Sequence, residues 1–484
     1  MLKRILLFLL LVGAMQMSSA TKIAVLSDIH ALSPRLVEPE SSAFEKYAAA
    51  NMRMVKESTE IFTTAIAQLL DEHPDVVLVP GDLTNNGELL SHEWVVAQFD
   101  MLQRHGIKVL VVPGNHDINN PYAKAFHADH TTEAATITRE EFRRLYEPFG
   151  YGAHSIGDSA SLSYVAEPVD GLVVIGIDSN RDEENRLKSR GDSITTYHTA
   201  GRVKPATLQW IATQARQARA QGKRVVAMMH HHLVEHFDGE ARMLHQYVVE
   251  DWEEVRNTLL QAGVHVAFTG HLHITDIARD YNNGDSITVV ATSSLSAYPF
   301  HYRIATIEGD CMHVDTRRVS AVPSNPALLA DGKAHVEDAV AGLMTGMMDR
   351  GLQKLERISK QYASAMGLPG EAELFSLLPR RQEILNLCKQ HLLPSAQAAM
   401  VALYEGNEAN HPQSEQLIAN LEKGINQVLL AVLPIETSNF IHEFVQENLL
   451  PQVHNVIRSM LQDRNHCGTP QETIVNDHTA TFPL

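Results

Sequence analysis

Five short apolar runs in the first 275 residues each end in a polar motif, and this repetition constrains the fold more than any other sequence feature. The runs, at residues 23–27, 75–80, 108–113, 224–229 and 264–269, are rich in β-branched residues and typical of buried strands. Ligands of open α/β sheets bind beyond the carboxyl ends of the strands. The motifs should therefore meet at one rim; they are Asp28-Ile29-His30, Gly81-Asp82, Gly114-Asn115-His116-Asp117, His230-His231-His232 and Gly270-His271-Leu272-His273.

Helical segments separate these runs, which predicts an α/β fold with parallel strands joined by right-handed crossovers. Apolar spacing and turn signals predict helices at residues 43–70, 91–104, 140–146, 205–220 and 250–262. Further strands are expected at residues 163–166, 172–178, 286–291, 302–307 and 312–316.

The pattern changes after residues 322–326, where strand-like runs stop. Helical periodicity follows at residues 335–366, 380–404, 412–433 and 436–463, and the last twenty residues are polar, which predicts a loose tail. We expect a domain at residues 21–325 and an all-α domain at 326–484. The helical domain either packs on its neighbour, covers a site or pairs two chains into a homo-oligomer, and the sequence leaves these alternatives open.

Residues 1–20 have the organisation of a signal peptide. Lys3 and Arg4 precede an apolar stretch at residues 5–12, and Ser18-Ser19-Ala20 supplies small residues for cleavage. A buried strand or an anchor is the alternative. No later stretch is long and apolar enough to span a membrane, so the prediction is an exported protein, periplasmic or secreted.

Charge and cysteine content narrow the function classes. The formal net charge of −18 argues against binding a nucleic-acid polymer, which requires positive side chains to displace counterions. Small phosphate substrates stay open, because a bound metal pair would dominate the local field. Three cysteines are too few for a disulfide framework.

The five motifs, in this order, resemble those of the calcineurin-like metallophosphoesterase superfamily, whose pattern is Asp-x-His, Gly-Asp, Gly-Asn-His, a histidine after a strand, and Gly-His-x-His. The resemblance covers about residues 22–319. It implies a four-layer α/β/β/α sandwich with two metal ions at one rim. By position, one ion would be held by Asp28, His30, Asp82 and His273, and the other by Asp82, Asn115, His230 and His271.

The resemblance also implies roles for other motif residues. His116 would be the catalytic residue beside the metals, and Asp117 would orient it. His231 would line the substrate pocket together with Asn115 and His116. The family usually has His-His-Pro where this chain has His230-His231-His232-Leu233, which leaves the register at His230 slightly open.

These residue types suit the chemistry. Two divalent ions about 3.5–4 Å apart can share a hydroxide and clamp the oxygens of a displacement at phosphorus. A carboxylate at Asp82 would bridge the ions, and imidazoles favour Mn, Fe or Zn. His116 can donate to a phosphoryl oxygen or protonate the leaving alkoxide.

Two stretches narrow the expectation further. Residues 81–88 lack the tyrosine that purple acid phosphatases place after Gly-Asp, and with residues 112–121 they resemble bacterial cyclic-nucleotide phosphodiesterase-type members that carry a helical C-terminal domain. The expected function is hydrolysis of small phosphodiesters or nucleotides, including cyclic ones. A phosphomonoesterase or nucleotidase on the same centre and a non-catalytic metal-bound interaction module are the alternatives.

Overall fold

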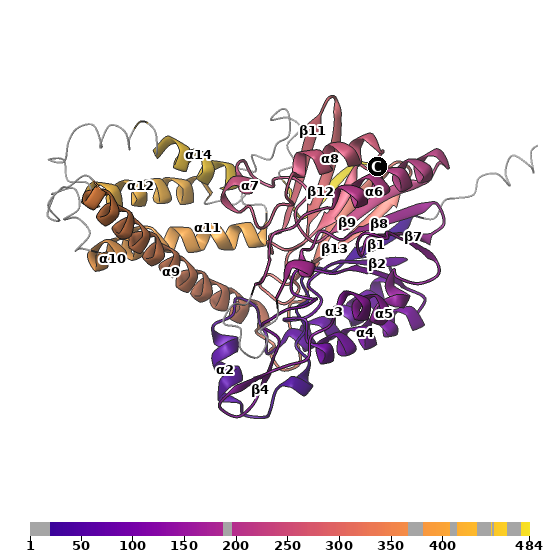
Figure 1. Ribbon diagram of the computed structural model, residues 1–484, viewed down its shortest axis with the longest axis horizontal. Coiled ribbons are helices and arrows are strands. Elements are labelled where there is room, and N and C mark those ends of the chain that lie inside the picture. Colours follow the sequence, from indigo (N-terminus) through magenta and orange to yellow (C-terminus); the bar gives the residue numbers. More distant parts are fainter. Residues whose placement is uncertain are drawn as a thin grey trace, which may run out of the picture.

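The computed structural model describes residues 20–186, 196–365, 381–406, 414–432, 447, 450–461 and 476–484. The predicted signal peptide therefore lies outside the described residues, apart from Ala20. Two mixed β-sheets face each other and helices cover both outer faces, while a group of long helices extends to one side (Figure 1).

Sheet 1 contains the first three motif-bearing strands. Its order is β15-β14-β13-β1-β2-β3, in which β1, β2 and β3 are parallel and the other pairs are antiparallel. Their bounds are β1 Thr21–Val25, β2 Val76–Pro80, β3 Lys108–Val112, β13 His301–Glu308, β14 Cys311–Arg318 and β15 Thr479–Pro483.

Sheet 2 contains the other two motif-bearing strands. Its order is β11-β12-β10-β9-β8-β7-β6, with β8, β9, β10 and β12 parallel. Their bounds are β6 Ser155–Gly157, β7 Tyr164–Val169, β8 Leu172–Ile177, β9 Arg224–Met229, β10 Val266–Thr269, β11 Asp276–Asn282 and β12 Asp285–Ala291.

Alternate residues of the central strands face two different apolar layers. In β1, Ile23 and Val25 pack between the sheets against residues such as Met228 and Phe268, whereas Ala24 packs on the outer face among the helices. Sheet 1 is covered by α3 Ser58–Glu72, α4 Leu89–Arg104 and α5 Arg139–Leu145, and sheet 2 by α6 Pro205–Ala220 and α8 Trp252–Gln261. The predicted four-layer α/β/β/α sandwich is confirmed.

One predicted helix is two helices. Residues 43–70 form α2 Ser42–Ala49 and α3, separated by a turn in which the Asn51 side chain accepts hydrogen bonds from the backbone N–H of Arg53 at 3.1 Å and from its Nε at 2.9 Å. This local bonding competes with the helix. The remaining short elements are the hairpin β4 Lys124–Phe126 and β5 Thr131–Glu133, α7 Glu240–Met243, and 3-10 turns at Pro34–Leu36, Glu147–Phe149 and Asp182–Glu184.

The helical region begins with α9 and is joined to the sandwich beside a motif-bearing loop. Its described helices are α9 Leu328–Ala365, α10 Arg381–His391, α11 Leu393–Glu405, α12 Ser414–Val432 and α14 Leu450–Leu461. The end of α11 meets Thr275, whose hydroxyl donates to the Tyr404 carbonyl at 2.8 Å and whose N–H donates to the Leu403 carbonyl. The predicted single helix at 380–404 is split because Pro394 starts a new helix.

None of the helices in the described part of the chain is long and apolar enough to cross a membrane. Cys311 is an exposed free thiol and Cys388 a buried one. The first part of the predicted helix at 436–463 lies largely outside the described residues.

The predicted loose tail is wrong for residues 476–484, because they complete sheet 1. β15 pairs with β14 along its whole length, and Phe482 is buried between the sheets with 2% exposure. The Asp477 carboxylate accepts the N–H of Ile277 at 3.1 Å in sheet 2, while its carbonyl accepts from the buried Arg303 guanidinium of sheet 1. This segment therefore connects both sheets.

We expect Phe482→Ala to destabilise the protein by about 3 kcal/mol, because it leaves a cavity in the layer between the sheets. That loss corresponds to roughly 6 °C in melting temperature, measurable by calorimetry. Thr481→Ser is the matched control, since Thr481 is exposed on the same strand and serine keeps its hydroxyl. An unchanged melting temperature for Phe482→Ala would show that β15 does not hold the sheet.

Candidate metal centre

The carboxyl ends of five strands from both sheets deliver the motif residues to one rim of the sandwich. β1 leads to Asp28 and His30, β2 to Asp82, and β3 to Asn115 and His116, while β9 and β10 lead to His230 and to His271 and His273. The sheets are brought together there by direct contacts, such as the hydrogen bond from the His271 N–H to the Asp28 carboxylate at 3.0 Å. The predicted convergence is present.

The backbone at this rim is strained at five of the expected ligand positions. Residues with positive φ among them are Asp28 (51°), His30 (45°), Asp82 (51°), His271 (74°) and His273 (64°). Non-glycine residues rarely adopt this conformation, at a cost of roughly 1–3 kcal/mol each, and such positions cluster at functional sites. The turns bend the chain so that successive side chains point into the same space.

Two motif glycines allow the strand ends to approach closely. A Cβ on Gly114 would collide with the backbone N and the carboxylate of Asp82, and a Cβ on Gly270 would collide with the Ser27 hydroxyl and the Asp28 carboxylate. The glycines of the motifs are thus required by close packing between strand ends.

Asp28, His30 and His273 form the first group of donor atoms. His273 Nε2 lies 3.3 Å from Asp28 Oδ1 and 3.3 Å from His30 Nε2, and His30 Nε2 lies 3.8 Å from Asp28 Oδ1. Donor atoms around one tetrahedral ion, with bonds of about 2.1 Å, are separated by about 3.4 Å. The spacing fits a common cation.

Asp82, His230 and His271 form a second group, with Asn115 beside it. His230 Nε2 is 3.4 Å from Asp82 Oδ2 and 3.0 Å from Asn115 Oδ1. Asp82 Oδ2 is also 3.5 Å from His30 Nε2 of the first group. One carboxylate oxygen therefore stands between the two groups, as a bridging ligand would.

Hydrogen bonds behind the rings fix which nitrogen faces the rim. His230 donates from Nδ1 to the Pro80 carbonyl at 2.9 Å, and His271 donates from Nε2 to the Gln246 carbonyl at 3.0 Å. The opposite nitrogen of each ring faces the rim, which is the usual arrangement of metal-binding histidines. Burial would lower the pKa of His230, but the Asp82 carboxylate raises it to about 9, so a cation bound there would displace the Nε2 proton.

Burial makes this donor set unfavourable without cations. Asp28 and Asp82 are 0% and 2% exposed. Burial would raise the pKa of Asp82, but the neighbouring His230, whose own pKa this carboxylate raises to about 9, outweighs burial and holds the pKa of Asp82 well below its usual range. Burial lowers the pKa of His30 and of His271 well below the usual value, so both rings are neutral and ready to bind a metal. The residues fit a pair of divalent cations.

His116 lies beside both groups. Its ring centre is 4.9 Å from that of His30, and its backbone N–H donates to Asp82 Oδ1 at 2.8 Å. Its Nδ1 donates to the Asn85 carbonyl at 2.8 Å and faces Asn86 Oδ1 at 3.1 Å. Burial lowers the pKa of His116 to about 4. The ring is thus held in one orientation, with Nε2 free.

The expectation that Asp117 orients His116 does not match these contacts. The Asp117 carboxylate accepts hydrogen bonds from the N–H groups of Leu83, Thr84 and Gly114 and from the Thr84 hydroxyl, at 2.8–3.1 Å. Burial, with the nearby charge of Asp82, raises its pKa to about 7. Asp117 ties the β2 loop to the β3 loop, and Asn85 orients the ring.

The expectation that His231 lines the substrate pocket does not match either. Its side chain is fully buried, Ser179 Oγ lies 2.8 Å from Nδ1, and Nε2 donates to the Thr199 carbonyl at 2.9 Å. Its ring packs against those of His230 and His271. His231 supports the ligand rings from behind, which is consistent with His230 occupying the rim.

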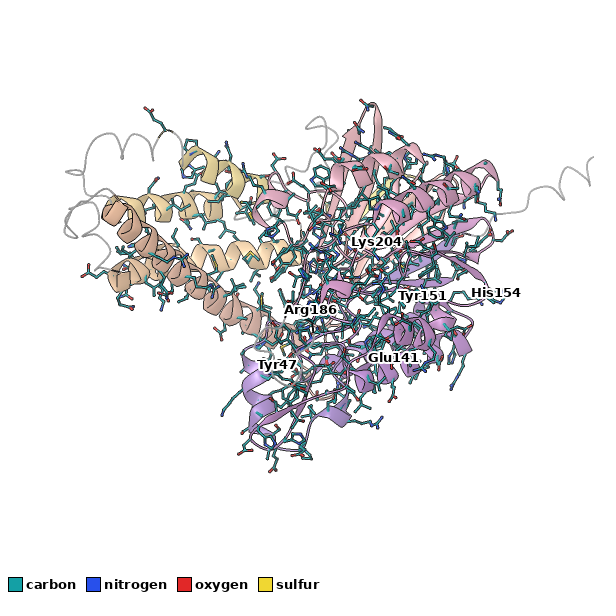
Figure 2. The ribbon with its side chains drawn as sticks, viewed as in Figure 1. Tyr47, Glu141, Tyr151, His154, Arg186 and Lys204 are labelled. Carbon is teal, nitrogen blue, oxygen red and sulfur yellow. The ribbon has the colours of Figure 1, made fainter. Side chains whose placement is uncertain are left out.

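Three further residues contact the residues of the site, although they lie in segments that carry no motif. The hydroxyl of Tyr197 accepts from Asn115 Nδ2 at 2.8 Å, and the Arg53 guanidinium contacts His30 Nδ1. Tyr47 on α2 (Figure 2) bonds the side chains of Asn85 and Asn86. No periodicity or spacing marked them, because their positions depend on tertiary contacts between distant segments.

We expect Gly270→Ala to weaken metal binding by roughly 10- to 100-fold, because the added methyl group displaces Ser27 and the Asp28 carboxylate. The measurement is the dissociation constant for Mn²⁺ by calorimetry. Gly157→Ala is the control, since nothing lies within 4 Å of a Cβ there. Equal affinities in both variants would mean that this contact does not shape the site.

Comparison with known proteins identifies the family of this chain. Residues 21–275 match the sequence profile of calcineurin-like phosphoesterases. Similar solved structures include a dimetal phosphatase from Danio rerio, at 13% identity over 62% of this chain and 96% of that chain with a TM-score of 0.42. Another is the sulfate thiohydrolase SoxB from Thermus thermophilus, in complex with glycerol, at 13% identity over 66% and 60% with a TM-score of 0.32. No curated protein matches significantly. On the profile match, the chain belongs to the calcineurin-like phosphoesterase family.

Proposed function

We propose that the protein is an exported phosphoesterase that hydrolyses small phosphodiesters, cyclic nucleotides included, at a two-metal centre. The observation that carries the proposal is the position of Asp82, whose Oδ2 lies within 3.5 Å of His30 and of His230, with His116 alongside. A bridging carboxylate between two imidazole groups suits a pair of ions about 3.5–4 Å apart.

The proposed ligand set follows the two donor groups. One ion, Mn, Fe or Zn, is held by Asp28, His30, Asp82 and His273, and the other by Asp82, Asn115, His230 and His271. Bound divalent ions supply a water of lowered pKa and neutralise charge on the phosphoryl oxygens. The chain holds the ligand atoms in place through the buried hydrogen bonds behind them.

In this proposal His116 is the catalytic proton donor. Its Nδ1–H is engaged by the Asn85 carbonyl, so Nε2 is the nitrogen that faces a substrate. Burial favours the neutral ring, whereas a bound anionic phosphoryl group favours the protonated one. The Nε2 proton then passes to the leaving oxygen as the ester bond breaks.

The charges around the rim favour a diester over a monoester. A monoester brings a dianion, which calls for a further cation beside the metals. In the part of the chain that the structure describes, the positive charge of Arg53 acts to lower the pKa values of His30, His116 and Tyr197. Its guanidinium nevertheless lies behind His30, where it bonds the Asn51 side chain and contacts the His30 ring. A monoanionic diester needs no such partner. Phosphomonoester or nucleotide hydrolysis at the same centre is the second candidate.

Export belongs to the proposal as well. The signal-like sequence at residues 1–20 lies mostly outside the described residues, so its support is its composition alone. Expressed in a Gram-negative host, the protein should appear in the periplasm with a mass that lacks residues 1–20. Full-length protein in the cytoplasm would contradict export.

We expect the manganese-loaded protein to cleave a generic phosphodiester such as bis(p-nitrophenyl) phosphate faster than the matching monoester. Asp82→Ala should abolish both activities and lower the metal content of each chain, because it removes the ligand shared by both ions. Metal content is measured by mass spectrometry. A preference for the monoester would favour the second candidate, and two bound metals without cleavage of either ester would favour an interaction module.

We expect His116→Gln to lower kcat by roughly 10²- to 10⁴-fold on an alkyl ester, because glutamine cannot transfer the proton. The loss should be much smaller on a p-nitrophenyl ester, whose leaving group needs little protonation. His105→Gln, at an exposed position, is the control. Equal losses on both esters would exclude proton donation by His116.

A further inference from the structure

A tyrosine stands open to solvent just after the His116 motif. Tyr122 is 48% exposed, whereas large apolar side chains of the described residues are mostly buried. It lies in the loop between β3 and β4 rather than in a sheet or a helix. A single exposed aromatic residue is ordinary on a protein surface, so the significance of Tyr122 depends on the residues to which it is connected.

The position of Tyr122 is tied to that of His116 by one buried side chain. Asn120, which is 1% exposed, donates from Nδ2 to the His116 carbonyl at 3.0 Å and accepts the Tyr122 N–H at 2.9 Å. The backbone of Tyr122 is therefore held at a fixed position relative to His116 by the two hydrogen bonds of Asn120.

A second tyrosine fills the space between them. The Tyr197 ring lies 5.4 Å from that of Tyr122 and 6.1 Å from that of His116, edge-on to both. Its hydroxyl is bound by the Asn115 side-chain amide and donates to the Asn115 carbonyl at 3.2 Å. Tyr197 is consequently fixed to the metal centre, and Tyr122 extends its aromatic surface outward.

We propose that Tyr122 and Tyr197 form an aromatic subsite that binds a planar ring carried by the leaving group of the substrate. The inference deepens the proposed function and rests on it for the orientation. If His116 protonates the leaving oxygen, the group attached to that oxygen extends along the His116 side of the centre, where the two tyrosines lie. The chemical class is a phosphoester with an aryl or nucleobase ring on its leaving side.

The nature of the two side chains favours ring stacking over other ligands. Aromatic pairs are stabilised beyond the burial of area when their edges and faces meet, and stacking on tyrosine is tolerant of the ring's substituents. A flexible alkyl chain would bury apolar area against the two tyrosines, but it would lack the electrostatic attraction between the edges and faces of aromatic rings. Selectivity for a flat ring over a saturated ring of the same size is the distinguishing property.

The test compares binding of two analogues that have two P–C bonds and no ester bond, benzyl(methyl)phosphinate and cyclohexylmethyl(methyl)phosphinate, to the manganese-loaded full-length protein by calorimetry. The wild type should bind the benzyl compound roughly 2- to 12-fold more tightly. Tyr122→Leu should remove that preference and Tyr122→Phe should keep it. Tyr281→Leu, on the edge strand β11 of sheet 2, is the matched control and should also keep it.

Equal binding of both analogues by the wild type, absence of binding, or a preference that survives Tyr122→Leu would overturn the subsite. Because neither analogue is hydrolysed, this outcome is separate from the fate of the proposed function. A ring preference in a protein that cleaves no diester would leave the subsite standing and reject the phosphodiesterase. Diester cleavage without a ring preference would support the phosphodiesterase and reject the subsite.

Discussion

The burial of two carboxylates at one rim is the constraint on which the rest of the structure depends. Asp28 and Asp82 are withdrawn from water, and an unpaired buried charge costs several kcal/mol. The surrounding imidazoles relieve this only in part, because Asp82 favours the protonated form of His230 whereas burial and mutual repulsion disfavour the protonated forms of His30 and His271. Divalent cations would balance both carboxylates at once. The pairing of two sheets around this rim, and the hydrogen bonds behind each ring, are ways of holding an arrangement that is unfavourable without cations.

The same constraint explains where the backbone is strained. Five expected ligands have positive φ, because the chain must reverse immediately after a strand to aim a side chain inward. Gly114 and Gly270 serve the complementary purpose of letting neighbouring strand ends touch. The energy for these conformations comes from the apolar layers between and outside the sheets, which are distant from the chemistry. Stability of the sandwich and precision of the rim are therefore coupled.

Much of this could be predicted from sequence because the signals were local. Each motif follows a β-branched run, so the amino-acid order alone places Asp28, Asp82 and His271 at strand ends. Residues positioned by distant contacts gave no such signal: Tyr197 reaches Asn115 across 82 positions, and Arg53 stands in a turn that interrupts an apparently continuous helix. The roles expected for Asp117 and His231 failed because adjacency in a motif does not decide which neighbour a side chain contacts. A five-residue strand at Thr479–Pro483 was too short and polar to recognise.

The pairing of β14 with β15 makes the helical region an insertion within a β-hairpin. Residues 319–478 separate Arg318 from Thr479, yet the two strands lie side by side in sheet 1. During synthesis the edge of that sheet stays open until the ribosome has made every helix of the region. Long-range strand pairing is slow because a large loop must close first. A chain built in this way keeps the outer edge of β14 unpaired through most of its synthesis, so the last residues to be made decide whether sheet 1 is complete.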